Sequence, residues 1–244
     1  MRTNANIGVS VIIPALNEEA HLEDAFRSVQ NAAEAAGVDP EIVIINDGSR
    51  DETPSIANRL ARESKRVRVI HHSRNRGFGA SYRSGLKEAS EDLVLMIPGD
   101  NEILQSSIKN ILAVAGEADL IIPYTSNTEV RNPIRRIVSG VFTSAMNFFF
   151  GLKLQYYNGP CLLPRSAVMR MRGISPGFAY MAQILVRLIV IKKMTYREVP
   201  MRIATPKKRK TKAFAMKNVL NVIFAVTSLW WEVQLKRFSW KKRK

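Results

Sequence analysis

The chain has 244 residues, 46% of them hydrophobic, and a single cysteine, Cys161. This length and composition suit one large α/β domain with peripheral additions, or two small domains, and they exclude a disulfide framework within the chain. The net charge of +16 is unevenly distributed, because residues 1–130 carry −6 and residues 131–244 carry +22. The second part is therefore expected to meet an anionic partner: phosphate, a membrane surface or nucleic acid.

The apolar stretches of the chain do not indicate targeting or membrane spanning. Residues 1–8 are mostly polar, which is not the pattern of a signal peptide. The longest apolar runs, 138–152 and 219–231, fall short of the roughly 20 apolar residues that a bilayer-spanning helix needs. Both runs suit a core or an interface.

The first half of the chain alternates between strand and helix patterns. Strands are expected at short apolar runs that end near turn residues: 9–14, 41–46, 67–71, 93–98 and 118–123. Helices are expected between them, at 18–36, 53–64, 81–90 and 106–115. This alternation predicts a mainly parallel sheet with helices on both faces. Ligands bind beyond the carboxyl ends of such strands, where Asn17, Asp47 and Asp100 are placed.

Beyond Arg131 the pattern is more apolar and strongly basic. The expected elements are a helix, a strand, a helix, a strand, a basic loop and a final apolar helix, at 133–151, 156–164, 178–192, 195–200, 206–212 and 213–238. We therefore divide the chain into a ligand-binding core, a second part of the same domain, and a basic, apolar C-terminal helix and tail, at 1–130, 131–212 and 213–244.

Three short motifs place polar residues or glycines after the strands. Asp47-Gly48-Ser49 is typical of a turn, and Asp100-Asn101-Glu102 is typical of a helix N-terminus with an acidic first turn. Gly77 and Gly79 make an incomplete dinucleotide fingerprint, because Tyr82 stands where a third glycine belongs. Read one at a time, each motif has a structural explanation as good as a functional one.

Taken together and in this order, residues 12–18, 45–53, 75–85 and 96–100 resemble glycosyltransferase family 2, and most closely its polyprenyl-phosphate branch, the dolichol-phosphate mannose synthase-like enzymes. The resemblance implies a GT-A, Rossmann-like fold with C-terminal interfacial helices. It implies inverting transfer of a sugar from a GDP- or UDP-linked donor, bound by residues 1–130, to a polyprenyl phosphate. It also implies a peripheral enzyme at the cytoplasmic face of a membrane.

The resemblance also assigns roles at the donor site. Asp47 would contact the base or ribose, and Arg76 and Gly79 would lie on a loop that closes over the donor. Asp100 matches the last aspartate of the D-x-D motif, and with Glu102 it would hold Mg²⁺ or Mn²⁺. Such hard cations take carboxylate oxygens and neutralise a leaving diphosphate. The whole donor-binding set is Pro14, Leu16, Glu18, Asp47, Arg76, Gly79, Gly99 and Asp100.

Three positions depart from the family pattern. Pro98 replaces the first aspartate of D-x-D, Asn46 replaces the first aspartate of the usual D-D-G-S, and Leu16 stands where tyrosine is common. The lost carboxylate is expected to weaken metal binding or to shift the choice of donor. An inactive homologue is the alternative that these changes leave open.

No carboxylate side chain lies between Glu129 and Glu198, a stretch that includes most of the second part of the domain, residues 131–212. A hydroxyl acceptor normally needs a general base, whereas a phosphate monoester arrives largely ionised and needs cations to position it. The resemblance assigns the acceptor-phosphate contacts to Arg135 and Ser139. Arg165 resembles an arginine of a catalytic loop near the phosphates, and Lys212 matches the lysine of a C-terminal motif that is degraded here. The catalytic set that the resemblance implies is Asp100, Arg135, Ser139, Arg165 and Lys212.

A lipid-linked acceptor requires access to a membrane. The stretches 142–152 and 219–231, with Trp230, Trp231 and Trp240, suit a membrane interface, and the basic C-terminus suits anionic headgroups. The second stretch also suits a core or an oligomer contact, and a membrane-anchoring subunit stays open. Two other functions remain: transfer to a hydroxyl acceptor in polysaccharide or glycolipid synthesis, and non-catalytic binding of membranes or nucleic acid. Nucleic acid is not expected, because the basic residues are not interleaved with base-stacking aromatics.

Overall fold

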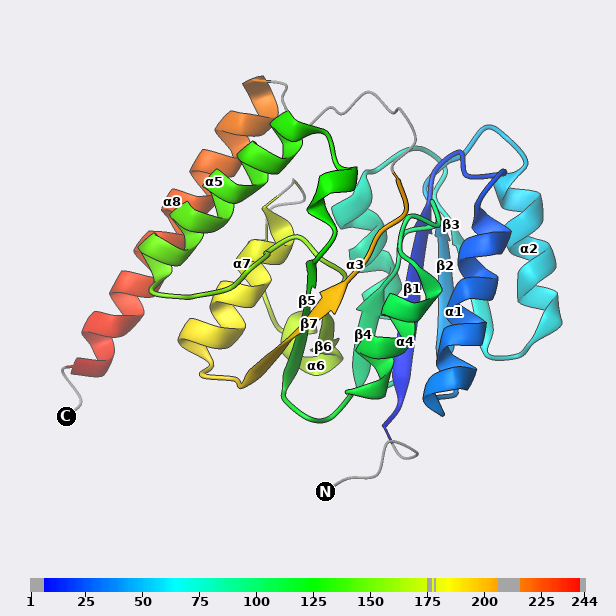
Figure 1. Ribbon diagram of the computed structural model, residues 1–244, viewed down its shortest axis with the longest axis horizontal. Coiled ribbons are helices and arrows are strands. Elements are labelled where there is room, and N and C mark those ends of the chain that lie inside the picture. The colour runs from blue at the N-terminus through cyan, green and yellow to red at the C-terminus, as the bar shows by residue number, and fades with distance from the viewer. Residues whose placement is uncertain (1–6, 175–176, 178, 206–215, 242–244) are drawn as a thin grey trace.

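The structure, a computed structural model, describes residues 7–174, 177, 179–205 and 216–241. Its centre is a seven-stranded sheet with the order β3-β2-β1-β4-β6-β5-β7 (Figure 1). The strands are β1 (Val9–Ala15), β2 (Glu41–Asn46), β3 (Val67–His71), β4 (Leu93–Met96), β5 (Leu120–Thr125), β6 (Leu162–Pro164) and β7 (Tyr196–Met201). The pairings among these strands are parallel except those of β6 with β4 and β5. The mainly parallel sheet expected from the sequence is confirmed.

Helices cover both faces of this sheet (Figure 1). One face carries α1 (Leu22–Ala36), α2 (Thr53–Glu63) and α4 (Gln105–Ala113), and the other carries α3 (Phe78–Glu88) and α7 (Tyr180–Val186). Side chains alternate along a strand, so Ile12 and its neighbour Ile13 enter different cores. The continuous apolar runs of the sequence are therefore strands that are buried on both sides.

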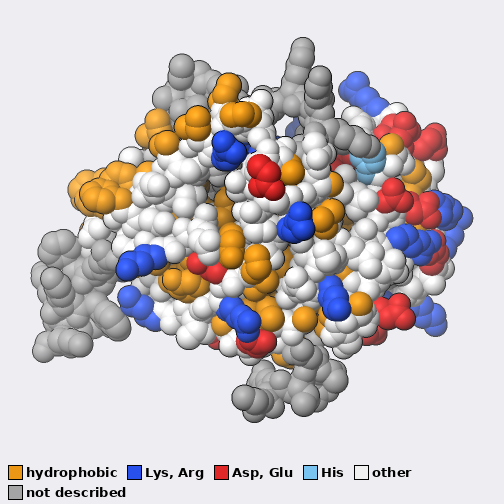
Figure 2. Space-filling model, in the orientation of Figure 1, with side chains coloured by type: hydrophobic (Ala, Val, Ile, Leu, Met, Phe, Trp, Pro, Cys, Tyr) orange, Lys and Arg blue, Asp and Glu red, His pale blue; other side chains and the backbone are white. Residues whose placement is uncertain are grey.

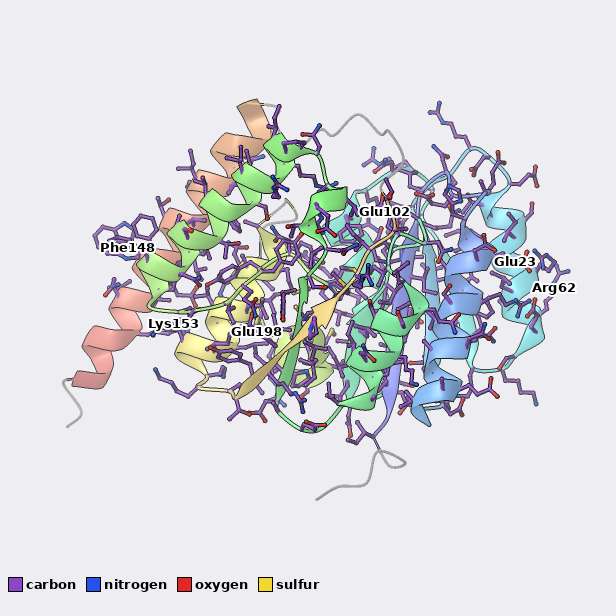
Figure 3. The ribbon with its side chains drawn as sticks, in the orientation of Figure 1. Glu23, Arg62, Glu102, Phe148, Lys153 and Glu198 are labelled. Atoms are coloured by element: carbon purple, nitrogen blue, oxygen red, sulfur yellow. The ribbon has the colours of Figure 1, made fainter. Side chains whose placement is uncertain are left out.

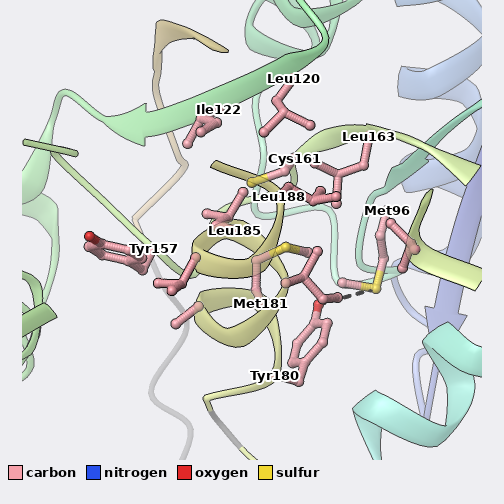
Figure 4. Close-up of a cluster of buried hydrophobic side chains, with 14 of the residues drawn as sticks. Met96, Leu120, Ile122, Tyr157, Cys161, Leu163, Tyr180, Met181, Leu185 and Leu188 are labelled. Atoms are coloured by element: carbon pink, nitrogen blue, oxygen red, sulfur yellow. Dashed lines mark hydrogen bonds between the residues drawn. The ribbon is translucent and has the colours of Figure 1, made fainter. Parts of the chain in front are cut away.

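The core on the α7 face is built largely from residues of the second half of the chain. Figure 4 shows Met96 of β4 and Leu120 and Ile122 of β5 packed beside Leu185 of α7. Cys161 lies in this core, and burial raises the pKa of its thiol well above the usual value. The cysteine is therefore a packing residue and not a reactive thiol.

The prediction of a strand at 156–164 is wrong for most of these residues. Only β6 is a strand, and the preceding segment is a loop held against α5 (Pro133–Phe150). The Tyr157 hydroxyl donates to Asn147 Oδ1 at 2.8 Å, and Asn147 Nδ2 donates to the Leu154 carbonyl at 2.8 Å. These bonds fix the loop to the helix. The expected helix at 178–192 is α7, which continues as a π-helical turn, η3 (Arg187–Ile191).

The two longest helices, α5 and α8 (Met216–Lys241), lie side by side beyond the edge strand β7 (Figure 1). Arg187 Nε donates to Glu232 Oε2 at 3.0 Å, which ties α8 to η3. Two short helices, η2 (Thr128–Val130) and α6 (Arg165–Met169), follow β5 and β6. Within the described ranges, neither α5, α8 nor any shorter helix combines the length and the apolar composition that crossing a bilayer requires.

Candidate active site

The loops that follow the first four parallel strands meet at one edge of the sheet, because the carboxyl ends of these strands coincide. A cavity of about 530 Å³ opens among the loops after β1, β2 and β3. This volume is within the range of small-molecule sites, roughly 300–1,000 Å³. Its lining contains two arginines and no carboxylate, which favours an anionic ligand. The lining residues are Leu16, Asn17, Asn46, Gly48, Ser49, Arg50, His72, Ser73, Arg74 and Asn75.

Hydrogen bonds join the loop after β1 to the loop after β2. The Asn17 N–H donates to Ser49 Oγ, and the Arg50 N–H donates to Asn17 Oδ1, both at 2.9 Å. The Glu18 N–H donates to Thr53 Oγ1 at 2.8 Å. Asn17 has φ of 55°, a left-handed conformation that asparagine tolerates better than most residues. Hydrogen bonds within the chain therefore hold this rim of the cavity in place without a ligand.

The loops after β2 and β3 approach each other closely at Gly48. Its φ is 74°, and a Cβ built there would overlap the backbone of Arg74. Only glycine meets both the conformation and the close approach. The glycine of the turn motif is thus required by the shape of the cavity.

The Asp47 carboxylate organises the loop after β3. Its Oδ1 accepts from the Arg76 N–H at 2.9 Å, and its Oδ2 accepts from the Gly77 N–H at 2.8 Å. His72 Nδ1 lies 2.6 Å from Oδ1. The sequence predicted that Asp47 contacts the base or ribose, and this stays a prediction; in the structure both oxygens of this buried carboxylate accept from the loop. Asp47 shapes the cavity, while its neighbours Asn46 and His72 line it.

The two histidines at the end of β3 point to opposite faces of the sheet. Asn46 Nδ2 lies 3.0 Å from His71 Nδ1, and Asn58 Oδ1 lies 3.0 Å from His71 Nε2. An amide NH₂ only donates, so His71 Nδ1 accepts from Asn46 in this arrangement. Asn46 Oδ1 also accepts from the Ser49 N–H at 3.0 Å. A carboxylate cannot fill both roles, which is a physical reason for asparagine where the family pattern has aspartate.

His72 faces α3 instead, where its Nε2 lies 2.8 Å from Ser84 Oγ. Both histidines have hydrogen-bond partners at both ring nitrogens. What the sequence missed is that His72 also lines the cavity. A polar residue directly after an expected strand was the available signal.

Asp100 and Glu102 lie on the turn after β4, at the same edge of the sheet. Figure 3 labels Glu102 at this edge. The Glu102 N–H donates to Asp100 Oδ1 at 3.1 Å. Asn101 between them has φ of 54° and accepts from Ser28 Oγ of α1 at 3.2 Å. The Glu102 carbonyl accepts from the Ala204 N–H at 2.8 Å. The turn is thus held between α1 and the segment that follows β7.

These two carboxylates fit a hard divalent cation. Both residues are half-buried and separated by one position on a fixed turn. Across the described ranges no cluster of three or more His, Cys, Asp or Glu side chains could enclose a metal. Proteins usually bind Mg²⁺ through one or two carboxylates, and phosphates and water fill the remaining coordination positions. The donor set therefore fits a cation bound jointly with a diphosphate.

The other predicted donor-site residues are spread around this edge. Pro14 is buried in β1 beside Ile45, and Leu16 lines the cavity. Glu18 is buried below the rim, while Arg76 is exposed on the loop that Asp47 holds. The Gly99 N–H donates to the Pro14 carbonyl at 3.0 Å, which joins the turn after β4 to β1. Gly79 lies buried in the first turn of α3 and faces a second, separate cavity.

The predicted phosphate-handling residues are not all brought to this edge. Arg135 and Ser139 lie in the first turns of α5, which begins shortly after the carboxyl end of β5, so they are at the Asp100 end of the sheet. Arg165 is at the opposite end, because β6 is antiparallel. Its N–H donates to the Asp92 carbonyl at 2.8 Å, just before β4 begins. Its Nε donates to the Leu86 carbonyl at 3.1 Å. Lys212 lies outside the described residues.

The structure thus does not bring Arg165 near Asp100, and it gives Arg165 a structural partner instead. The predicted phosphate contact of Arg165 gains no support from this geometry. What remains at one edge is a preformed polar cavity, a carboxylate pair beside it, and Arg135 and Ser139 on the other side of that pair.

Residues 10–176 match the model of the family described as Glycosyl transferase family 2. A dolichyl-phosphate beta-glucosyltransferase of Trichomonas vaginalis is 28% identical over 148 residues, covering 55% of this chain and 46% of the relative. A dolichol-phosphate mannosyltransferase of Pyrococcus furiosus is 32% identical over 127 residues, covering 51% and 35%. The chain therefore spans less than half of the length of these curated relatives.

A third relative and a solved structure extend the comparison. An undecaprenyl-phosphate 4-deoxy-4-formamido-L-arabinose transferase of Shewanella sediminis is 29% identical over 165 residues, covering 67% of this chain and 49% of the relative. The fold matches that of glucosyl-3-phosphoglycerate synthase from Mycobacterium tuberculosis, solved with Mn²⁺, UDP and glucosyl-3-phosphoglycerate. That match has a TM-score of 0.67 and 21% identity, and covers 93% of this chain and 81% of the other. At this identity the match establishes the GT-A-like fold.

Proposed function

Because the chain belongs to glycosyl transferase family 2, we propose that it transfers a sugar, with inversion, from a nucleotide-diphosphate sugar to a polyprenyl phosphate. The observation that carries this proposal is the meeting of a preformed cavity and the Asp100–Glu102 pair at one edge of the sheet. The names of three relatives, which describe transfer linked to dolichyl or undecaprenyl phosphate, support this acceptor class.

The cavity would hold the nucleoside half of the donor. Its lining of amides, hydroxyls and His72 offers donors and acceptors to a base and ribose, and Arg50 and Arg74 offer charge to phosphates. Asp100 and Glu102 would hold Mg²⁺ or Mn²⁺, which neutralises the charge that develops on the leaving diphosphate. In this proposal residues 1–130 form the donor-binding core.

The acceptor would approach from the α5 side, within residues 131–212. Arg135 is exposed and Ser139 is half-buried one turn further along α5, so both would hold the acceptor phosphate. A phosphate oxygen would attack the anomeric carbon as the bond to the diphosphate breaks, which inverts the configuration. An ionised phosphate needs no general base, which agrees with the lack of a carboxylate between Glu129 and Glu198.

The exposed face of α5 and α8 would rest on the membrane that contains the acceptor. Ile134, Ile137, Val138 and Val141 repeat at helical spacing along α5, and each is between 47% and 65% exposed. Phe148, further along α5, points away from the sheet (Figure 3). Hydrophobic side chains gather over this helix on the face seen in Figure 2. An apolar stripe within the basic second part of the chain fits an anionic lipid surface. In this proposal the enzyme binds peripherally at the cytoplasmic face of the membrane.

The test is product formation by the purified full chain. Liposomes with undecaprenyl or dolichyl phosphate are mixed with radiolabelled UDP-glucose or GDP-mannose and Mg²⁺ or Mn²⁺. Label is expected in the organic phase and is lost with EDTA. Asp100→Asn should reduce the rate by about 10²-fold, the scale of losing one charge-stabilising group. Asp24→Asn, an exposed site on α1, is the matched control.

Two outcomes would contradict the proposal. Label that appears only in a water-soluble product would favour a hydroxyl acceptor. The complex of the structural neighbour with glucosyl-3-phosphoglycerate gives this second candidate a specific basis. No product and no metal-dependent nucleotide binding would indicate the inactive homologue that the loss of the first D-x-D aspartate allows.

A further inference from the structure

A second cavity lies on the α3 side of the sheet. It has a volume of about 350 Å³ and is lined by α3, α6, the turn after α6, and α7. The α3 wall includes Arg83, Leu86 and Lys87, the turn contributes Arg172, and α7 contributes Ile184. No residue lines both this cavity and the one at the carboxyl edge. The two cavities therefore have separate linings.

The charge around this cavity has one sign. Three of its lining residues are cations, Arg83, Lys87 and Arg172, and none is acidic. Arg83 and Lys87 are one helical turn apart, so both side chains lie on the same face of α3. The neighbouring Glu88 does not line the cavity. Among the described lining residues the cations have no acidic neighbour, and such a cluster beside a cavity favours an anionic ligand, phosphate above all.

The interior of the cavity is apolar. Most of the other lining residues are aliphatic, aromatic or methionine side chains, including Leu86, Met171 and Ile184. Arg83 Nη2 donates to the Ile174 carbonyl at 3.3 Å, so this guanidinium is held against the cavity wall. The volume is near the lower end of small-molecule sites, which suits a short apolar body and not an entire lipid.

We infer that this cavity binds the phosphate-bearing end of an amphiphile, with the phosphate at Arg83, Lys87 and Arg172 and the adjoining carbons against Leu86, Met171 and Ile184. Such an end occurs in a prenyl phosphate and in an anionic phospholipid. The inference does not need the proposed transferase activity, because it rests on a cavity that shares no residue with the nucleotide cavity.

The test is calorimetric titration of the full chain with geranyl phosphate below its micelle concentration. Geraniol, inorganic phosphate and dihexanoyl phosphatidic acid are titrated in parallel. Geranyl phosphate is expected to bind at least tenfold more tightly than geraniol or inorganic phosphate. Tighter binding of geranyl phosphate than of the phosphatidic acid identifies a prenyl phosphate site, and the reverse order identifies a phospholipid site. Equal affinity for inorganic phosphate would overturn the apolar half of the inference.

Two variants test the location. Arg83→Gln with Arg172→Gln should weaken geranyl phosphate binding at least tenfold, because charge-assisted hydrogen bonds are lost. The matched control, Arg62→Gln with Lys109→Gln, removes the same charge from α2 and α4 on the opposite face. Equal losses in the two double variants would overturn the inference. Binding of UDP with Mn²⁺ should be unchanged in both, which separates this test from that of the proposed function.

A third variant tests the apolar wall without touching a charge. Met169 is 42% exposed at the cavity, so Met169→Trp can narrow the space without disturbing the core. It should abolish geranyl phosphate binding and leave the thermal unfolding temperature within about 2 °C. Retained affinity with an unchanged unfolding temperature would overturn the assignment.

Discussion

His72 Nδ1 lies 2.6 Å from Asp47 Oδ1, and both side chains are buried between the ends of β2 and β3. An ionised carboxylate only accepts, so the imidazole donates through Nδ1. The same carboxylate accepts from two backbone N–H groups of the next loop. Asp47 thus joins two strand ends to a loop that lines the candidate donor cavity.

Replacing Asp47 by asparagine should disrupt this loop. The amide NH₂ cannot accept a hydrogen bond, so at least one donor among Arg76, Gly77 and His72 loses its acceptor. We expect a loss of about 1–3 kcal/mol in the free energy of unfolding, measured by urea denaturation. Nucleotide affinity should fall as well, because the loop lines the cavity. Asp24→Asn is the control, since that side chain is exposed on α1. Equal effects of the two substitutions would contradict the role of Asp47.

Two buried tyrosines give opposite predictions for the same chemical change. The Tyr82 hydroxyl is buried and has no hydrogen-bond partner among the residues that the structure describes. Tyr82→Phe should therefore leave the free energy of unfolding unchanged or raise it by up to about 1 kcal/mol. The Tyr157 hydroxyl donates to Asn147 Oδ1, so Tyr157→Phe should lower the free energy of unfolding by about 1 kcal/mol or more. Thermal unfolding of both variants in parallel checks the sign, and a reversed order would contradict this account of the core.

The Arg187–Glu232 pair makes the attachment of α8 sensitive to acid. Burial raises the pKa of Glu232, but the hydrogen bonds and charges of Arg187 and Lys236 together outweigh burial, and the pKa lies below its usual value. A depressed pKa contributes stability that is present above the unfolded-state value, about 4.3, and lost as the pH falls through the lower folded value.

Glu232→Gln should therefore destabilise the protein at pH 7, by about 1–3 kcal/mol, because Arg187 loses its charged partner. The difference from the unsubstituted protein should shrink as the pH falls below 4. Chemical denaturation at pH 7 and pH 3.5 measures both. Asp24→Asn, an exposed acid on α1, supplies the control. A difference that stays constant with pH would rule out the ion pair as the cause.

Charge placed on the exposed stripe of α5 should reduce membrane binding without unfolding the protein. Ile137→Asp with Val141→Asp changes two exposed positions one turn apart, so core packing is unaffected. Sedimentation with vesicles of phosphatidylglycerol and phosphatidylcholine should show at least a tenfold loss of binding. Asn31→Asp with Ala35→Asp makes the equivalent change at exposed positions of α1. If both double variants lose binding equally, net charge and not the stripe attracts the protein to lipid.

The strands β1, β2 and β3 were predictable because each is an apolar run that ends at a strong turn signal. The position of Arg165 was not predictable, because its place depends on the direction of β6. A strand of three residues, Leu162–Pro164, carries no local sign of whether it runs parallel or antiparallel to its neighbours. Its antiparallel direction moves Arg165 from the Asp100 edge to the opposite edge.

The candidate site was predictable to the level of loops and not of side chains. Motif order places Asp47 and Asp100 after strands β2 and β4, and the structure agrees. The direction in which each side chain points depends on contacts between loops that are far apart in sequence. Asp47 turns toward the Arg76–Gly77 backbone, and His72, which carries no motif signal, lines the cavity in its place.

The carboxylate of Asp47 also has a consequence for the timescale of motion. Backbone amides that donate to a buried carboxylate exchange their hydrogens with solvent only when the structure around them opens. The amides of Arg76 and Gly77, on an otherwise exposed loop, should therefore exchange slowly in the protein without nucleotide. The loop that lines the cavity would then be ordered before a ligand binds. Little conformational entropy is therefore lost on binding, and association does not require the loop to fold first.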